Sequence, residues 1–556
     1  MDAATATGST REKQEASSLE RSSELCRHRF RLGDPTVDAS EAAAISNSDA
    51  PHNSTRITPG IERRCVAAIW AVALASILIR LPAVIHQPGG QDEDYFAVAG
   101  WSLLQTGVPR IPYAPSLNIH GVFYKANEVL YALPPGFFAA EAVVFRIVGP
   151  SYAAGRLTSL LAGATAVVGV FWLTRRWFSA SSALVAATIF AFSRPFLFPA
   201  TTARPDMLCT ALLIWSLVLL ASGRSQSPGA LEAASAGQGT DVPRSRWRTL
   251  VAGLLIGLAL LTHPFALLGL ILAVGWIVIT PSDRKRLQLL LFLAGAAAVM
   301  ALWLPLIAKD PALFRTQFGN NVLQRAGPGL LARIFWPWET LWYHAKLFLE
   351  LAGPWQSALF GTSLVAATML ELRSERRRRD WLLMTWISVF GLAILQGVHP
   401  SKGYWSFPAV FLCMAAARVV DAFGRWKPAA ILLSLPLLVP GGGWKAAGVY
   451  LRHWGDPDYS HPEAVQRLFD ELPAAKARYL VDVGCVFDWH LSGRRTLLAL
   501  DLPQYYSSAG EPFDFLVVTR TGLEQQLPRK LGPSQRILAF GKLDDDLAVY
   551  VEVWKR

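Results

Sequence analysis

Apolar stretches long enough to cross a lipid bilayer recur along this chain from about residue 64 to residue 446. A helix needs roughly 20 apolar residues to cross the hydrocarbon core. The composition also argues against a soluble protein, because 52% of residues are apolar and only 17% are charged. We therefore predict a polytopic α-helical membrane protein with about eleven transmembrane helices. The predicted spans are 64–86, 155–174, 181–199, 207–222, 249–262, 264–281, 287–308, 351–371, 381–397, 408–423 and 428–446.

Short clusters of basic residues lie between the apolar stretches and predict the orientation of the chain. Loops on the cytoplasmic side of a membrane carry an excess of Lys and Arg. With eleven spans and a cytoplasmic N-terminus, every cluster falls on the cytoplasmic side. The net charge of +12 then needs no nucleic-acid partner. The clusters are Arg63-Arg64, Arg175-Arg176, 244–248, 284–286, 373–379, and Arg425 with Lys427.

The same pattern divides the chain into three parts. Residues 1–60 are polar and predict a disordered cytoplasmic tail. Residues 61–446 form the predicted transmembrane domain, whose first outward loop, 87–154, contains two predicted interfacial helices at 95–106 and 134–148. Residues 447–556 contain three strand-like runs and predict a small α/β domain outside the cytoplasm. Those runs begin at Tyr479, Asp514 and Ala548.

The acidic cluster Asp92-Glu93-Asp94 stands in the first outward loop, within ten residues of a span. Adjacent carboxylates repel one another, and each can have a raised pKa. Such a group can act as a general base or can bind a divalent metal ion. The alternative is a run of solvated loop charges, and the local pattern leaves both readings open.

Several cations are predicted on the same side of the membrane. Arg204-Pro205-Asp206 lies between two spans with almost no loop, where charges are costly unless they pair or have a function. Arg80 interrupts the first span, and Lys402 follows a span closely. These cations suit a phosphate site, since cations stabilise a developing dianion. Simpler alternatives are an Arg204–Asp206 ion pair and an Arg80 side chain that reaches the membrane surface.

The residues from Asp92 to Gly107 resemble the first-loop motif of the GT-C glycosyltransferases. The resemblance is greatest to the branch that contains the protein O-mannosyltransferases and the lipid A aminoarabinose transferases. Asp92, Glu93, Phe96 and Gly107 match that motif in register. Further family landmarks follow in the family's order: Pro134-Pro135, 154–157, Ala162-Gly163, Arg175-Arg176, 203–207, 261–263 and 401–404.

The resemblance implies an enzyme that transfers a sugar from a polyprenyl-phosphate donor, with inversion, to an acceptor hydroxyl at the extracytoplasmic face. The acceptor can be a lipid, a glycan or a protein. By this resemblance Asp92 is the base, Glu93 supports it or binds metal, and Asp206 is a second carboxylate. The residues implied to bind substrate and phosphate are Arg204, Lys402, Arg80, Tyr404 and Lys125.

The chain departs from the family pattern at two positions. The family often has a Glu-Lys pair before the double proline, whereas Leu133 stands here and the nearest charges are Lys125 and Glu128. It often has Lys where this chain has His263. Glu93 and His263 are therefore the candidate metal ligands, and a divalent metal is an option that the residues do not require.

A transporter or flippase of lipid-linked sugars is the alternative function. A transporter favours charges deep within spans, broken helices and paired repeats. Here the charges collect at one face and no repeat is visible, which favours the enzyme. The Ala- and Arg-rich composition, without an endoplasmic-reticulum retention signal, predicts a bacterial inner-membrane protein with lipid partners.

Overall fold

The computed structural model describes residues 59–222, 246–280, 282, 284–324, 329–373, 379–398, 401–438, 443–473, 477–533 and 535–556. The described residues belong to one compact unit, Pro59–Arg556. The predicted cytoplasmic tail lies almost entirely outside the described residues.

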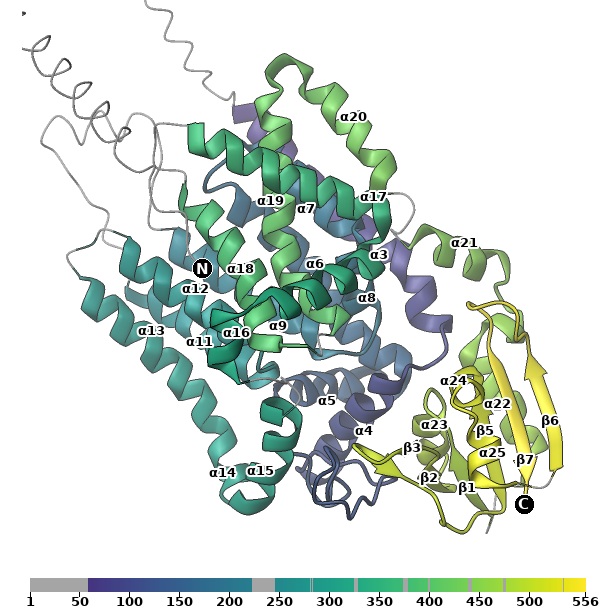
Figure 1. Cartoon of the computed structure of the whole chain (residues 1–556). Coiled ribbons are helices and arrows are strands. Elements are labelled where there is room, and N and C mark those ends of the chain that lie inside the picture. Colours follow the sequence, from purple (N-terminus) through teal and green to yellow (C-terminus); the bar gives the residue numbers. More distant parts are fainter. Residues whose placement is uncertain are drawn as a thin grey trace, which may run out of the picture. The chain divides into compact units, whose positions relative to one another are not determined.

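A helix begins or runs within each predicted span (Figure 1). Four helical segments in the described part of the chain are long and apolar enough to cross a membrane. There are five if α7 and α8, which meet at a 58° bend, form one span. Several others, such as α9 and α12, are shorter, so the count of eleven stays a prediction. The helices are α3 (Pro59–His86), α6 (Tyr152–Thr174), α7 (Ala180–Phe192), α8 (Arg194–Thr201), α9 (Pro205–Ala221), α11 (Arg246–Thr262), α12 (Ala266–Ile279), α13 (Lys285–Met300), α17 (Trp338–Arg373), α18 (Arg379–Gln396), α19 (Ser406–Ala422) and α20 (Lys427–Leu438).

Breaks between these helices coincide with proline. α11 ends at Thr262 and α12 begins after Pro264, which agrees with the prediction of two helices in the apolar stretch 249–281. Proline cannot donate a backbone hydrogen bond and clashes with the preceding turn. α17 is likewise kinked at Gly353, where φ is +71° and Pro354 follows. Non-helical backbone therefore interrupts the helical region near Pro264 and at Gly353.

The predicted first loop contains two helices, α4 (Gln91–Thr106) and α5 (Gly136–Val148), as expected. α4 begins four residues earlier than predicted, with Gly90 as its N-cap. The acidic cluster therefore lies in the first turn of a helix, just before the predicted helix start, and still within the segment 87–154. Carboxylates are stabilised there, because the helix dipole places partial positive charge at the N-terminus.

The C-terminal region forms a five-stranded sheet with the order β2-β1-β5-β7-β6. Strands β1 (Arg478–Val481), β2 (Arg495–Leu498) and β5 (Phe515–Thr519) are parallel, whereas β7 (Tyr550–Lys555) and β6 (Gln535–Gly541) are antiparallel to their neighbours. The predicted runs correspond to β1, β5 and β7. Strands β2 and β6 were not predicted. β6 is a largely exposed edge strand, and it lacks the alternating burial that makes a strand recognisable.

One hydrophobic core joins the first loop to the C-terminal domain. Side chains of α4, α5 and the loop between them pack in the same cluster as side chains of α22 (His461–Glu471), α23 (Val486–Leu491) and the sheet. The backbones meet at Gly89 and Gly484, where a Cβ on Gly484 would lie 2.6 Å from the carbonyl oxygen of Gly89. The C-terminal domain is therefore packed against the helix that carries the acidic cluster.

Candidate active site

The three acids of the cluster contact three different parts of the protein. Successive residues of an α-helix project roughly 100° apart, so neighbouring side chains leave the helix in different directions. Asp92 forms an ion pair with Arg204, Glu93 pairs with Arg156, and Asp94 bonds to the C-terminal domain. Three carboxylates that look alike in the sequence thus have different environments.

Glu93 is a buried and fully bonded carboxylate. Arg156 Nε donates to Oε1 at 2.7 Å, and its Nη2 donates to Oε2 at 2.6 Å. The backbone amides of Ala203 and Gly90 also donate to Oε1 and Oε2, both at 2.8 Å. Because every oxygen is engaged, Glu93 ties α4 to α6 and to the segment before α9. Arg156 therefore has a structural role, because its guanidinium is buried and bonded to Glu93.

Asp94 connects the acidic helix to the C-terminal domain. The side chain is fully buried and accepts hydrogen bonds from the Tyr152 hydroxyl and from the backbone amide of Gly484, the latter at 2.6 Å. Burial raises the pKa of Asp94 well above its usual range, and the two hydrogen bonds counteract part of that rise. Asp94 therefore holds α4 against the C-terminal domain, a contact that no local sequence pattern reveals.

Asp92 is the partly exposed acid of the acidic cluster. Its side chain is 47% exposed, and one carboxylate oxygen contacts Arg204. Arg204 is the N-cap residue of α9, and its Nε donates to Asp206 Oδ2 at 2.7 Å. Its Nη2 donates to Ser401 Oγ at 2.9 Å. Arg204 therefore joins two carboxylates and the segment that begins at Ser401, and we call these four residues the Arg204 cluster.

Asp206 is the fully buried member of the Arg204 cluster. Its Oδ1 is buried and has no hydrogen-bond partner in the described part of the chain. Gly403 packs directly against the carboxylate, so that a Cβ at this position would collide with Asp206. Lys402, one residue earlier, is exposed. The structure thus places Asp92, Arg204 and Asp206 together, with Lys402 beside them.

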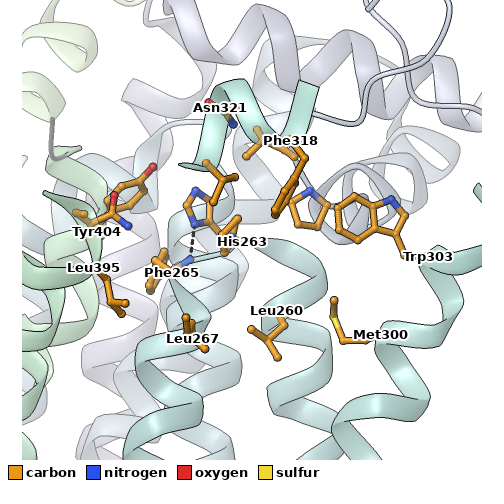
Figure 2. Close-up of a pocket in the computed structure, with 15 residues that line it drawn as sticks. Leu260, His263, Phe265, Leu267, Met300, Trp303, Phe318, Asn321, Leu395 and Tyr404 are labelled. Carbon is orange, nitrogen blue, oxygen red and sulfur yellow. Dashed lines mark hydrogen bonds between the residues drawn. The ribbon is translucent and has the colours of Figure 1, made fainter. Parts of the chain in front are cut away.

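An apolar cavity of about 340 Å³ is lined in part by Tyr404, the residue after Gly403 (Figure 2). Its polar lining includes His263, whose ring centroid lies 4.8 Å from that of Tyr404, with the two ring planes tilted by 54°. His263 Nδ1 also accepts a hydrogen bond from the amide of Phe265 at 3.1 Å. Because Tyr404 belongs to the same short helix as Lys402 and Gly403, η3 (Lys402–Trp405), this helix connects the cavity with the Arg204 cluster. The apolar lining includes Leu260, Leu267, Met300, Trp303, Phe318 and Leu395.

Arg80 and Lys125 have other contacts than the sequence suggested. The guanidinium of Arg80 is buried, donates to the carbonyls of Ser76 and Ala191, and lies 4.6 Å from the ring centroid of Phe196. It neither reaches the surface nor faces an open site. Lys125 pairs with Glu128 at 3.6 Å. Neither side chain contacts the Arg204 cluster within the described residues.

Glu93 and His263 do not fit the metal site that the sequence suggested. Both oxygens of Glu93 are bonded to cationic or amide donors, and Nδ1 of His263 is bonded to a backbone amide. Across the described ranges, no group of three or more His, Cys, Asp or Glu side chains is placed to hold a metal ion. No step of the chemistry below is therefore routed through a metal.

Sequence reasoning also missed Glu141, a buried acid on α5. It lies between Gly100 of α4 and Gly155 of α6, where a Cβ on either glycine would meet its carboxylate. Both of its oxygens lack a hydrogen-bond partner among the described residues, and burial raises its pKa well above the usual range. Burial thus favours the protonated form of the Glu141 carboxyl. Gly100 and Gly155 leave the space that the Glu141 side chain occupies, and they were the available signal for this residue in the sequence.

The fold is that of the GT-C glycosyltransferases, a class of multi-pass membrane enzymes, as the motif resemblance predicted. The structure of ArnT from Cupriavidus metallidurans bound to undecaprenyl phosphate covers 88% of this chain and 97% of its own, at 15% identity and a TM-score of 0.53. Its apo structure gives the same values. The oligosaccharyltransferase AglB from Archaeoglobus fulgidus, solved with an inhibitory peptide and a dolichol-phosphate, covers 82% of this chain and 70% of its own, at 12% identity and a TM-score of 0.47.

A sequence-family match is more specific than the fold but covers a smaller part of the chain. Residues 133–308 match the family described as dolichyl-phosphate-mannose-protein mannosyltransferase. The matched region contains Arg204, Asp206 and His263, whereas the acidic cluster lies before it. No curated protein sequence matches the chain.

Proposed function

We propose that this chain is an integral membrane glycosyltransferase that moves a sugar from a polyprenyl-phosphate donor to an acceptor hydroxyl. The GT-C fold and the match to a family named for dolichyl-phosphate-mannose transfer support this class. Because the ArnT structure holds undecaprenyl phosphate, a lipid-phosphate donor suits the shared fold. The sugar is a hexose or a pentose, and the acceptor is a lipid, a glycan or a protein.

The single observation that carries the proposal is the open carboxylate of Asp92 beside Arg204. In the proposed reaction, Asp92 takes the proton of the acceptor hydroxyl as its oxygen attacks the anomeric carbon. The bond from that carbon to the phosphate oxygen breaks, and polyprenyl phosphate leaves with the electron pair. Attack from the side opposite the leaving group inverts the anomeric centre. Phosphate is a good leaving group, so cations suffice to stabilise it.

The charge balance of the Arg204 cluster bears on how the donor is accepted. One guanidinium faces two carboxylates, Asp92 and Asp206, so the cluster has no excess positive charge by itself. A donor phosphate that engages Arg204 competes with Asp92 for it and so releases the base. The exposed ammonium of Lys402 supplies additional positive charge beside the cluster. Arg204 and Lys402 are therefore our candidates for phosphate binding, and Asp206 holds Arg204 in place.

The apolar cavity beside the cluster suits the prenyl chain of the donor. Its lining is mostly aliphatic and aromatic, and hydrocarbon burial there is favourable at about 25 cal/mol per Å². Tyr404 and His263 stand where the cavity approaches η3. We assign these two side chains to the junction of the prenyl chain and the phosphate.

The distribution of basic residues supports the orientation of the proposed enzyme. Its N-terminus is cytoplasmic, and transfer occurs at the extracytoplasmic face, where the C-terminal domain lies. We place it in a bacterial inner membrane. A transporter function gains no support from the Arg204 cluster, whose ion pairs join the ends of helices instead of lining a path between them.

Mass spectrometry of outer-surface glycans tests the proposal. Cells that carry the wild-type chain should contain a glycan with one additional sugar that is absent from cells without it. The Asp92→Asn variant should also lack this sugar, whereas Glu339→Gln, a change at an exposed acid of α17, should keep it. Identical glycans with and without the wild-type chain would refute the proposed transfer.

A further inference from the structure

An exposed groove of about 260 Å³ lies where α3, α6 and α9 meet. α3 packs against α6, and α6 packs against α9. Trp70, Leu74 and Ile77 line the groove from α3, and Trp70 is 62% exposed. Thr165 lines it from α6, but its hydroxyl bonds within its own helix, and its carbonyl accepts a hydrogen bond from Trp215 Nε1 of α9 at 3.2 Å. The groove therefore presents hydrocarbon.

The groove lies on helices that belong to the membrane region. α3 and α6 are two of the helical segments that are long and apolar enough to cross a bilayer. Their exposed apolar side chains are therefore in contact with lipid chains. Hydrocarbon alone cannot select one lipid over another, because lipid tails are all about as apolar as Leu. Any selectivity of the groove must come from the charges at its end.

Arg63 lies on the same face of α3 as the groove. Arg63, Trp70, Leu74 and Ile77 are spaced by 7, 4 and 3 residues, which places them in one stripe of a helix. At 1.5 Å per residue, Trp70 lies about 10 Å and Ile77 about 21 Å from Arg63 along the helix. One leaflet of a bilayer contributes about 15 Å of hydrocarbon. The groove thus lies at the depth of the acyl chains of a lipid whose head group is beside Arg63.

The ends of the other two helices lie beside the start of α3. Arg175, the C-cap residue of α6, forms an ion pair with Glu62 of α3. Arg176 Nη2 donates to the hydroxyl of Ser222, the C-cap residue of α9, at 2.6 Å. Trp215 precedes Ser222 by seven residues, the same interval that separates Arg63 from Trp70. All three helices therefore place basic or polar ends about 10 Å from the near end of the groove.

Positive charge predominates at this end of the helices. Arg63 and Arg64 are exposed on α3. Burial lowers the pKa of Arg176, and the charges of Arg248 and Arg175 lower it further, as expected where cations are close together. Anionic head groups are attracted to such clusters of basic residues at the membrane surface.

We propose that this groove binds an acyl chain of an anionic phospholipid whose phosphate contacts Arg63. The chain lies along Trp70, Leu74 and Ile77, and the neighbouring arginines favour a head group with net negative charge. A zwitterionic phospholipid has the same chains and phosphate, but it also carries an ammonium group that the arginines repel. The site is thus selective for the charge of the head group.

The charged end of the groove is distinct from the Arg204 cluster. α9 begins after Arg204 and ends before Ser222, so the two lie about 26 Å apart along the helix axis. A donor phosphate at Arg204 and the phospholipid at Arg63 therefore occupy opposite ends of α9. The inference does not depend on the proposed sugar transfer.

Native mass spectrometry of the full chain in a neutral detergent tests the site. The probes are dioleoyl phosphatidylglycerol and dioleoyl phosphatidylcholine, which differ in head-group charge but not in chains. The wild type should bind the first phosphatidylglycerol about tenfold more tightly than the first phosphatidylcholine. Arg63→Gln should weaken phosphatidylglycerol binding about fivefold and leave phosphatidylcholine binding unchanged. Thr165→Phe fills the groove and should weaken binding of both lipids about tenfold.

Each variant has a matched control. Arg286→Gln removes an exposed cation of α13, and Leu78→Phe adds an aromatic ring at an exposed position of α3; neither residue lines the groove. Both should bind phosphatidylglycerol as the wild type does.

The inference is overturned if the wild type binds the two lipids equally, or if either groove variant binds phosphatidylglycerol as the wild type does. Because Arg63 is exposed, Arg63→Gln tests the site even when Thr165→Phe does not fold. Displacement of phosphatidylglycerol by an equal concentration of undecaprenyl phosphate would assign the groove to the donor lipid instead. A wild-type dimer that Thr165→Phe dissociates would assign it to a second copy of the chain.

Discussion

Arg156 and Glu93 form a buried two-point ion pair between α6 and the first turn of α4, with contacts of 2.7 and 2.6 Å. This pair fixes the helix on which Asp92 stands, while Asp92 itself remains partly exposed. Within the acidic cluster, Glu93 and Asp94 hold the helix, whereas Asp92, the proposed base, is the acid that stays partly exposed.

Loss of the Glu93 charge should destabilise the protein strongly. Glu93→Gln leaves the buried guanidinium of Arg156 without a counter-charge, which costs about 3–5 kcal/mol. The matched control is Glu128→Gln, which breaks the exposed Lys125–Glu128 pair and should cost less than about 1 kcal/mol. Thermal unfolding in nanodiscs compares the two. Equal shifts in Tm would show that Glu93 is not an anchor.

Substitution of Gly484 should loosen the C-terminal domain from α4. Gly484 has φ +90°, and an added Cβ would lie 2.6 Å from the Gly89 carbonyl. Gly510 has φ +87° but open space around its Cβ position. Gly510→Ala therefore carries only the backbone cost of a left-handed conformation, roughly 1–2 kcal/mol. We expect faster hydrogen exchange in the 86–94 segment for Gly484→Ala only, and similar exchange in both variants would contradict the close-packed junction.

A methyl group at Gly403 should disturb the Arg204 cluster. The added Cβ would collide with the Asp206 carboxylate and so displace the partner that positions Arg204. We expect transfer activity to fall about tenfold or more, with donor affinity reduced. Gly361→Ala, on α17, meets no atom within 4 Å and should leave activity unchanged. Equal activity of the two variants would show that Asp206 has no such role.

The C-terminal domain should be more stable at pH 5 than at pH 8 because of Asp482. Burial raises the pKa of this carboxyl to about 7, although amides of Val483, Thr519 and Gly522 donate to it. Between about pH 4 and pH 7 the folded state keeps a proton that the unfolded state has lost. The stabilisation is therefore complete below pH 4 and is lost as pH rises through 7.

Hydrogen-exchange protection of β1 and β5, corrected for the intrinsic rates, measures this dependence. The slope should approach at most about 1.4 kcal/mol per pH unit in that window. Asp482→Asn cannot ionise and should remove it. A variant that keeps the wild-type slope would assign the pH dependence to another group.

The sequence predicted the helices well because apolar length and proline positions are local properties. It also brought out Asp92, Arg204 and Asp206, although Arg204 lies more than a hundred residues from its Asp92 partner. Their ion pair depends on how α4 and α9 each pack against α6, which no local pattern encodes. The motif register could suggest that these residues share a site but not which atoms meet.

The errors have the same physical origin. The bond between Asp94 and Gly484 was not predicted, because the two residues lie 390 positions apart in the sequence. Arg80 was expected near a phosphate, but packing of α3 against α7 and α8 directs it to the Ala191 carbonyl and the Phe196 ring. A charged residue in an apolar span shows that a partner is needed, and only the tertiary structure identifies that partner.

The Asp92→Asn variant tests the central claim most directly. Purified in nanodiscs, it should fold, retain the Tm of the wild type within a few degrees and still bind polyprenyl phosphate. Transfer from prenyl-phosphate hexose and pentose donors should nevertheless fall about 100-fold or more, as expected for loss of a general base. If the variant instead transfers sugar at a rate within about threefold of the wild type, then Asp92 is not the base and the account of this site is wrong.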